Sequence, residues 1–227
     1  MTEPWREDVR ARLVEVGQRI EAAGGSDVTV VAVTKAFPVG VVETALGAGA
    51  VDLGENYAQE LVAKADHVLA AGLGPVRWHF IGGLQRNKVK VMGDHVHLWH
   101  SVDRGSLVDE IATRCPGARV LIQVNTTGEE AKAGCAPGIT AELVDRGQHG
   151  GLDVVGLMTV GPTDPAIDPR PAFARLRQLA ASCEVDQLSM GMSGDFEAAV
   201  SEGATIVRLG SILFGPRPPG RTSGVGG

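Results

Sequence analysis

Residues 28–35 read VTVVAVTK, an apolar and largely β-branched run that ends in a threonine and a lysine. β-branched residues favour extended strands. An uninterrupted apolar run is typical of a strand that is buried on both faces, and such strands belong to parallel sheets covered by helices. The stretch therefore predicts a buried parallel strand with Lys35 at its carboxyl end.

Helix-like and strand-like segments alternate along the chain outward from this stretch. The segment before it, residues 4–23, repeats apolar residues every three or four positions, as an amphipathic helix does. After it, short apolar runs alternate with further helical patterns. We expect strands at 28–33, 51–54, 78–82, 97–101, 120–124, 154–158, 187–190 and 205–209, and helices at 38–48, 57–71, 84–92, 104–114, 140–148, 171–182 and 195–202.

This alternation predicts the fold class. Parallel strands need a crossover connection, which the intervening helices supply. Eight strand–helix units in a chain of 227 residues favour a closed (β/α)8 barrel of the TIM type, with an extra N-terminal helix and no C-terminal β-domain. An open, doubly wound sheet is the alternative. We expect one barrel domain over residues 1–215 and a flexible, Gly- and Pro-rich tail over 216–227.

Composition narrows the function classes. The formal net charge is −6, which argues against non-specific nucleic-acid binding. Three cysteines at irregular spacing suit neither a disulfide framework nor a zinc site, and they fit a reducing cytoplasm. No apolar run is long enough for a membrane span, and the N-terminus lacks the pattern of a signal peptide. We expect a soluble, cytoplasmic monomer without a nucleic-acid or membrane partner.

Lys35 is the first candidate site residue. In barrels of this class the active site lies at the carboxyl ends of the strands, where Lys35 follows its apolar run. Partial burial of a lysine amine favours its neutral, nucleophilic form, which attacks an aldehyde to form a Schiff base. The alternative is a lysine that only marks the exit of the strand into solvent.

The ends of the last two expected strands carry a phosphate-binding pattern. Ser193 and Gly194 follow the seventh strand, with Ser193 as the expected N-cap of the next helix, and Gly210 and Ser211 follow the eighth. Helix N-termini attract anions, and barrels often bind phosphate between these two loops. The alternative is that the glycines serve only tight turns.

Arg208 lies in the last expected strand, two residues before Gly210, so the two positions share a face. An arginine that faces a barrel interior needs a partner, because its charge cannot be removed at ordinary pH. A bound ligand could supply that partner. The alternative is an internal ion pair with Glu55 or Asp195.

Beyond these positions, motifs along nearly the whole chain resemble the pyridoxal phosphate homeostasis protein family. They occur in the order typical of that family, from about residue 30 to residue 215. The matching segments are 33–35 (VTK), 54–60 (GENYAQE), 78–88 (WHFIGGLQRNK), 100–103 (HSVD), 123–125 (QVN), 132–134 (KAG), 156–158 (GLM), 188–193 (LSMGMS) with Asp195, 207–211 (VRLGS) and 214–215 (FG).

The resemblance implies a vitamin B6 site. The barrel would be similar to the N-terminal domain of bacterial alanine racemases, with pyridoxal 5'-phosphate (PLP) held as a Schiff base on Lys35. The remaining residues would take three roles: Ser193, Gly194, Gly210 and Ser211 would hold the phosphate, Arg208 would face the pyridine nitrogen and keep it unprotonated, and Asn56 and His79 would line the ring pocket. The family usually has a second acidic residue where this chain has Gly194.

The resemblance implies intracellular PLP homeostasis by storage, buffering or delivery, with apo forms of PLP-dependent enzymes as candidate recipients. The alternative is a PLP-dependent amino-acid racemase. A two-base racemase needs a second acid/base, commonly a tyrosine, opposite the lysine. The chain has one tyrosine, Tyr57, next to Asn56, and we expect only the flexible tail after the barrel. Strong catalysis is therefore not expected, and any activity would be weak and racemase-like.

Two further patterns are interpreted structurally. His95, His97 and His100 alternate as metal ligands on a strand can, but no cysteine or carboxylate cluster accompanies them, so we expect no metal site. The basic segment 85–90 lacks the interleaved aromatic residues of a single-strand nucleic-acid site, and it is interpreted as a solvated helix face.

Overall fold

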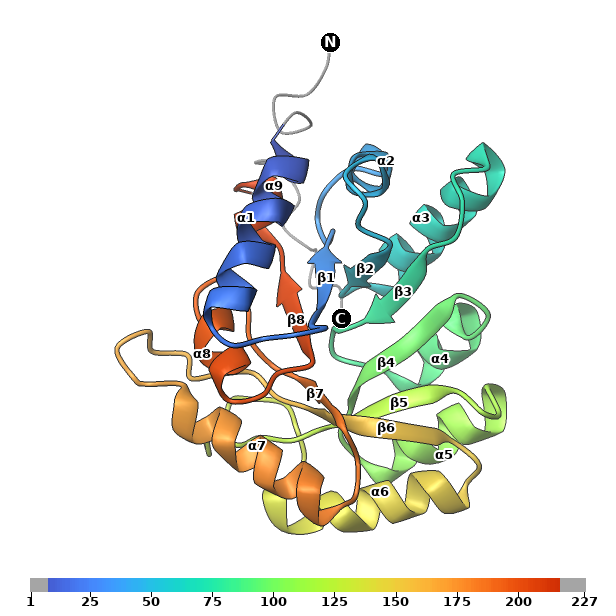
Figure 1. The fold of residues 1–227 in the computed structure, drawn as a ribbon. Coiled ribbons are helices and arrows are strands. Elements are labelled where there is room, and N and C mark those ends of the chain that lie inside the picture. Colours follow the sequence, from blue (N-terminus) through green and yellow to red (C-terminus); the bar gives the residue numbers. More distant parts are fainter. Residues whose placement is uncertain (1–7, 217–227) are drawn as a thin grey trace.

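A closed barrel of eight parallel strands, in sequence order, forms the centre of the computed structural model, which describes residues 8–216 (Figure 1). The strands are β1 (Thr29–Val33), β2 (Asp52–Glu55), β3 (Arg77–Phe80), β4 (Val96–Val102), β5 (Arg119–Gln123), β6 (Asp153–Met158), β7 (Gln187–Ser189) and β8 (Ile206–Leu209). The expected (β/α)8 class is confirmed, and the open sheet is excluded.

Helices surround the barrel. In chain order they are α1 (Val9–Ala22), α2 (Gly40–Gly47), α3 (Ala58–Ala71), α4 (Arg86–Met92), α5 (Gly105–Arg114), the 3₁₀ helix η1 (Pro137–Ile139), α6 (Thr140–His149), α7 (Arg170–Ser182), α8 (Phe196–Ser201) and α9 (Ser211–Phe214). The expected elements are all present, with ends that differ by up to a few residues, whereas η1 and α9 were not expected. The start of the expected first helix, 4–7, and the tail from 217 lie outside the described residues.

The extra helix α1 packs beside α8 and α9, near the seam where the barrel closes (Figure 1). At that seam β1 pairs with β8 in the register Thr29↔Ile206 to Ala32↔Leu209. The closure brings the carboxyl end of the first strand beside that of the last. No helix within residues 8–216 combines the length and the hydropathy that crossing a membrane requires.

Apolar side chains form two separate cores. The larger core fills the space between the strands and the surrounding helices. The smaller one lies inside the barrel and comprises Val31, Leu98, Leu121, Met158 and Ile206. Layers of side chains from different strands fill barrels of this type, so the interior is packed rather than hollow.

A chain of polar side chains crosses the barrel interior from β2 to β8. His79 Nε2 lies 3.0 Å from Asp52 Oδ1, and His79 Nδ1 lies 2.8 Å from His100 Nε2. His100 Nδ1 is 2.9 Å from Ser189 Oγ, which accepts a hydrogen bond of 2.7 Å from Arg208. The interior therefore links the amino end of β2 to Arg208 without a break.

The charged ends of this chain determine the direction of its hydrogen bonds. Desolvation opposes ionisation of Asp52, but hydrogen bonds from His79 and Arg77 outweigh it and hold the pKa of the carboxyl well below its usual range. Asp52 therefore accepts, and Arg208 can only donate. His79 Nε2 therefore donates to Asp52 and Arg208 donates to Ser189 Oγ, which fixes the direction of the hydrogen bonds at both ends of the chain.

Gly82, just beyond β3, allows two strand ends to approach closely. A Cβ atom there would lie 2.0 Å from the carbonyl oxygen of Asn56 and 2.6 Å from its Cα. Its neighbour Gly83 has open space at the same position. The glycine at 82 is therefore required by packing and the one at 83 is not.

We predict that Gly82→Ala lowers the free energy of unfolding by about 2 kcal/mol or more, because the methyl group must displace backbone atoms of Asn56. Gly83→Ala is the matched control, with an expected change within about 0.5 kcal/mol. Chemical denaturation of both variants measures the difference. Equal stability of the two variants would contradict this account of the packing.

The buried His100 predicts a pH dependence of stability. Desolvation holds the pKa of His100 well below its usual value, so in acid the unfolded chain takes up a proton that the folded chain does not. Above about pH 6.5 His100 is neutral in both states and does not reduce the free energy of unfolding. As the pH falls below that value, the free energy of unfolding decreases by up to about 1.4 kcal/mol per pH unit. His100→Gln should flatten the dependence of unfolding free energy on pH between about 7 and 5.

The exposed His149 supplies the control variant, His149→Gln. Denaturation curves recorded at several pH values, with each variant compared against the parent, give the slopes. An unchanged slope for His100→Gln would show that this imidazole does not titrate differently in the two states.

Candidate functional site

A cavity of about 760 Å³ opens at the carboxyl ends of the strands, a volume within the usual range of small-molecule sites. Its walls come from residues far apart in the sequence that barrel closure brings together. Seven of the eight predicted site residues line it: Lys35, Asn56, Ser193, Gly194, Arg208, Gly210 and Ser211. His79 is not among the lining residues.

Lys35 lies two residues beyond the end of β1, on the same side as Val33. Val33 and Lys35 both line the cavity, whereas Thr34 between them is buried on the other side, with its hydroxyl 2.6 Å from Glu55. Lys35 is half-buried. The alternative of a lysine that only marks the strand's exit into solvent does not fit this position.

Arg208 lies at the base of the same cavity and is only 4% exposed. It donates hydrogen bonds of 2.7 Å to Ser189 Oγ and 2.8 Å to the carbonyl oxygen of Thr159. Desolvation lowers its pKa to about 10, against the attraction of Asp195, so the side chain stays charged at neutral pH. Neither alternative carboxylate forms an ion pair with it within the described chain, since Glu55 pairs with Lys64 instead.

The turns after β7 and β8 form one continuous wall. Ser193 and Gly194 follow β7, Gly210 and Ser211 follow β8, and all four line the cavity. The amide of Ile212 lies 3.5 Å from Ser193 Oγ, which joins the two turns. The wall therefore offers two hydroxyl groups and turn backbone to an anion.

Two details of this wall differ from expectation. Ser193 is not the N-cap of the following helix: α8 starts at Phe196, after Asp195, whose carboxylate accepts a 2.6 Å bond from the amide of Met192. Gly194 is exposed and has open space where a Cβ would lie. Packing therefore does not require glycine there. Because the family usually has an acidic residue at this position, Gly194 leaves the cavity wall with one carboxylate fewer.

Asn56 and His79, predicted as a pair, separate in the structure. Asn56 lines the cavity, and its Oδ1 is a buried atom with no hydrogen-bond partner among the described residues. Such an atom is costly unless a ligand donates to it. His79 lies deeper in the barrel, 2% exposed, where it connects Asp52 to His100. Its contacts lead to the cavity through His100, Ser189 and Arg208.

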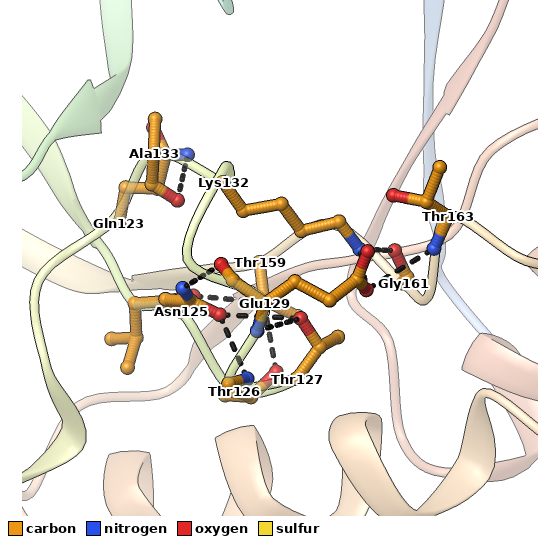
Figure 2. Close-up of polar contacts among 12 residues, drawn as sticks. Gln123, Asn125, Thr126, Thr127, Glu129, Lys132, Ala133, Thr159, Gly161 and Thr163 are labelled. Atoms are coloured by element: carbon orange, nitrogen blue, oxygen red, sulfur yellow. Dashed lines mark hydrogen bonds and ion pairs between the residues drawn. The ribbon is translucent and has the colours of Figure 1, made fainter.

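The loops after β5 and β6 are tied together, as Figure 2 shows, and Val160 of the second loop lines the cavity. Lys132 Nζ contacts Glu129 Oε1 at 2.7 Å and also donates to the carbonyl oxygen of Gly161. The hydrogen bond from Lys132 lowers the pKa of Glu129 to about 2. The hydroxyl groups of Thr126 and Thr159 lie 2.9 Å apart. Because Thr159 also anchors Arg208, this network braces the base of the cavity.

Apolar residues that the sequence analysis did not single out complete the cavity. They are Val33, Phe37, Ile81, Met158, Val160 and Met192. Several lie within the motifs quoted above, directly at or beyond strand ends, so position relative to the strand end was a signal that could have found them. They give the cavity a mixed surface that suits a flat apolar ring with polar substituents.

The chain matches a family model described as alanine racemase, N-terminal domain, over residues 9–218. It is 42% identical over 222 residues to the pyridoxal phosphate homeostasis protein of Pseudomonas aeruginosa, with 93% of this chain and 94% of the relative covered. With the protein of the same name from Aquifex aeolicus it shares 39% identity over 224 residues, which cover 91% and 97% of the two chains.

Solved structures agree with these matches. PipY of Synechococcus elongatus without PLP superposes with a TM-score of 0.82 at 29% identity, and PipY with PLP bound with a TM-score of 0.79 at 31% identity. Each comparison covers 91% of this chain and 100% of the other. Alanine racemase of Corynebacterium glutamicum, at 16% identity and a TM-score of 0.68, shares the fold over 64% of its length. The chain belongs to the pyridoxal phosphate homeostasis protein family, within the larger group of alanine racemase N-terminal domains.

Proposed function

We propose that the protein binds PLP through a Schiff base on Lys35 and serves intracellular PLP homeostasis by storing, buffering or delivering the cofactor. The observation that carries this proposal is the arrangement of Lys35, Arg208 and the two turns around one cavity. The names of the relatives, and the PLP bound to PipY, support the same ligand.

The residues around the cavity fit the chemistry of PLP. The amine of Lys35 would hold PLP covalently, and the cofactor would supply the aldehyde with which that amine forms a Schiff base. Ser193, Gly194, Gly210 and Ser211 would hold the phosphate, whose negative charge suits turn amides and hydroxyl groups. Asn56 Oδ1, a buried acceptor with no hydrogen-bond partner among the described residues, would accept a hydrogen bond from the hydroxyl group of the ring.

Arg208 would face the pyridine nitrogen. Because the guanidinium stays charged, it disfavours a second positive charge on that nitrogen and so keeps it unprotonated. A pyridine ring whose nitrogen carries no proton withdraws electrons only weakly. His79 acts in this proposal only through His100 and Ser189, which hold the guanidinium in place.

The racemase alternative receives less support. Tyr57, the one tyrosine of the sequence, is 40% exposed and is not among the residues that line the cavity. The residues that line the cavity therefore include no tyrosine that could act as the second acid/base opposite Lys35. We infer that the protein carries PLP rather than using it for rapid turnover, and that apo forms of PLP-dependent enzymes receive it.

We predict that the parent protein, mixed with PLP, develops the visible absorption band of a Schiff base, and that Lys35→Ala does not. The control is Lys90→Ala, which removes an exposed lysine on α4 and should leave the band intact. Absence of a band in the parent would overturn the proposal. A band that persists in Lys35→Ala would assign the covalent bond to another lysine.

We also predict no Lys35-dependent racemisation when the PLP-loaded protein is incubated with a panel of L-amino acids, because Tyr57 is not among the residues that line the cavity. Chiral chromatography measures the D-isomers, and PLP without protein supplies the background rate. Turnover that depends on both PLP and Lys35 would favour the racemase instead. Transfer of PLP from the loaded protein to an apo-enzyme, measured by recovered activity, tests delivery.

A further inference from the structure

A buried polar cluster lies behind Lys35, on the opposite side of the barrel wall from the cavity. It consists of Thr34, Glu55, Glu60 and Lys64, which we name the Lys64 cluster. The side chain of Lys64 is 4% exposed and that of Glu55 is fully buried. Lys64 Nζ lies 2.6 Å from Glu55 Oε1 and 3.5 Å from Glu60 Oε2. An ammonium group this deep is costly unless it is paired.

The cluster holds both peptide groups that flank Lys35. Lys64 Nζ donates a 2.7 Å bond to the carbonyl oxygen of Thr34, on the amino side of Lys35. Glu60 Oε2 accepts a 2.8 Å bond from the amide of Ala36, on the carboxyl side. Both side chains project from α3, four residues apart and so on one face of the helix. One helix therefore fixes the backbone on either side of Lys35.

The backbone at this point needs such support. Ala36 has φ = 63°, a left-handed conformation that residues with a Cβ adopt rarely. Conformations of this kind persist only where the surrounding structure holds them. The bond from the Ala36 amide to Glu60 supplies this constraint next to Lys35.

The direction of Thr34 supports the same interpretation. Its hydroxyl donates to Glu55 Oε1, the oxygen that also binds Lys64, so its side chain is drawn away from the cavity. Thr34 and Lys35 follow directly on β1, and Lys35 lines the cavity while Thr34 is held on the other side. Desolvation raises the pKa of Glu55 in spite of Lys64, as expected for a fully enclosed carboxyl.

We propose that Glu60 and Lys64 are positioning residues, which hold the peptide groups on both sides of Lys35 so that its amine meets an aldehyde in the cavity in a reactive geometry. This inference rests on the proposed function of Lys35. The two residues act through the backbone and touch neither the aldehyde nor the phosphate. Their loss should slow Schiff-base formation more than it weakens non-covalent binding.

The test separates these two quantities with two probes. PLP reports the rate constant of Schiff-base formation through its absorbance. Pyridoxine 5'-phosphate, which has a hydroxymethyl group instead of the aldehyde, reports non-covalent affinity by calorimetry. The variants are Glu60→Ala, which removes the acceptor of the Ala36 amide, and Glu60→Gln, which keeps one. His67→Ala is the control, since it removes the contact of α3 with Glu43 on α2 but no bond to the Lys35 peptides.

Glu60→Ala should lower the rate constant of Schiff-base formation about tenfold, as small displacements of reacting groups do. The affinity for pyridoxine 5'-phosphate should stay within about twofold of the parent value, since the phosphate wall is untouched. Glu60→Gln should recover most of the rate, and His67→Ala should match the parent. Because Lys64→Met alone leaves Glu55 buried and unpaired, the double variant Lys64→Met/Glu55→Met tests Lys64. It should slow the reaction in the same way.

Two results would overturn the inference. One is an unchanged rate constant in Glu60→Ala and in the double variant. The other is a parallel loss of rate, affinity and melting temperature, which would make the cluster a structural tie only. Failure of the proposed function looks different, because the parent itself would then form no Schiff base with PLP, whatever its affinity for pyridoxine 5'-phosphate.

Discussion

The pairing of β1 with β8 is the contact on which the rest of the molecule depends. These two strands are farthest apart in the sequence, and their four-residue register closes the sheet. Closure places Lys35, at the end of β1, beside Arg208 and the turn that begins at Gly210. An open sheet would hold the same strands and helices but would separate these groups. The site is thus a consequence of closure rather than of any single motif.

Closure also creates an interior that must be filled without water. Most barrel interiors use apolar layers, and here Val31, Leu98, Leu121, Met158 and Ile206 provide one. The remaining space holds the hydrogen-bonded chain from Asp52 to Arg208. A chain of this kind is stable only when each member has a partner. This chain holds Arg208 through the hydroxyl group of Ser189. The connected loops after β5 and β6 hold it through the carbonyl oxygen of Thr159.

Much of the fold and most of the cavity could be predicted from the sequence. The periods of β-strands and helices predicted every strand, and the positions of Lys35, Gly210 and Ser211 after strand ends predicted the cavity wall. The separation of Asn56 and His79 could have been predicted, because the expected strands 51–54 and 78–82 already place Asn56 beyond a strand end and His79 inside a strand. Lys64 was missed for a different reason. Glu60 and Lys64 have the spacing of an ordinary solvent-exposed pair, and only the packing of α3 against the ends of β1 and β2 buries them.

The contrast between the charge of the chain and that of its cavity has a kinetic consequence. The sequence carries a formal net charge of −6, yet at the base of the cavity Arg208 has hydrogen-bond partners and, among residues 8–216, no carboxylate within ion-pair distance. A phosphorylated ligand is therefore repelled at long range and attracted at short range. Added salt screens the distant repulsion more than the enclosed attraction. Moderate ionic strength would thus speed the encounter with an anionic ligand, the opposite of the behaviour of an electrostatically steered binding protein.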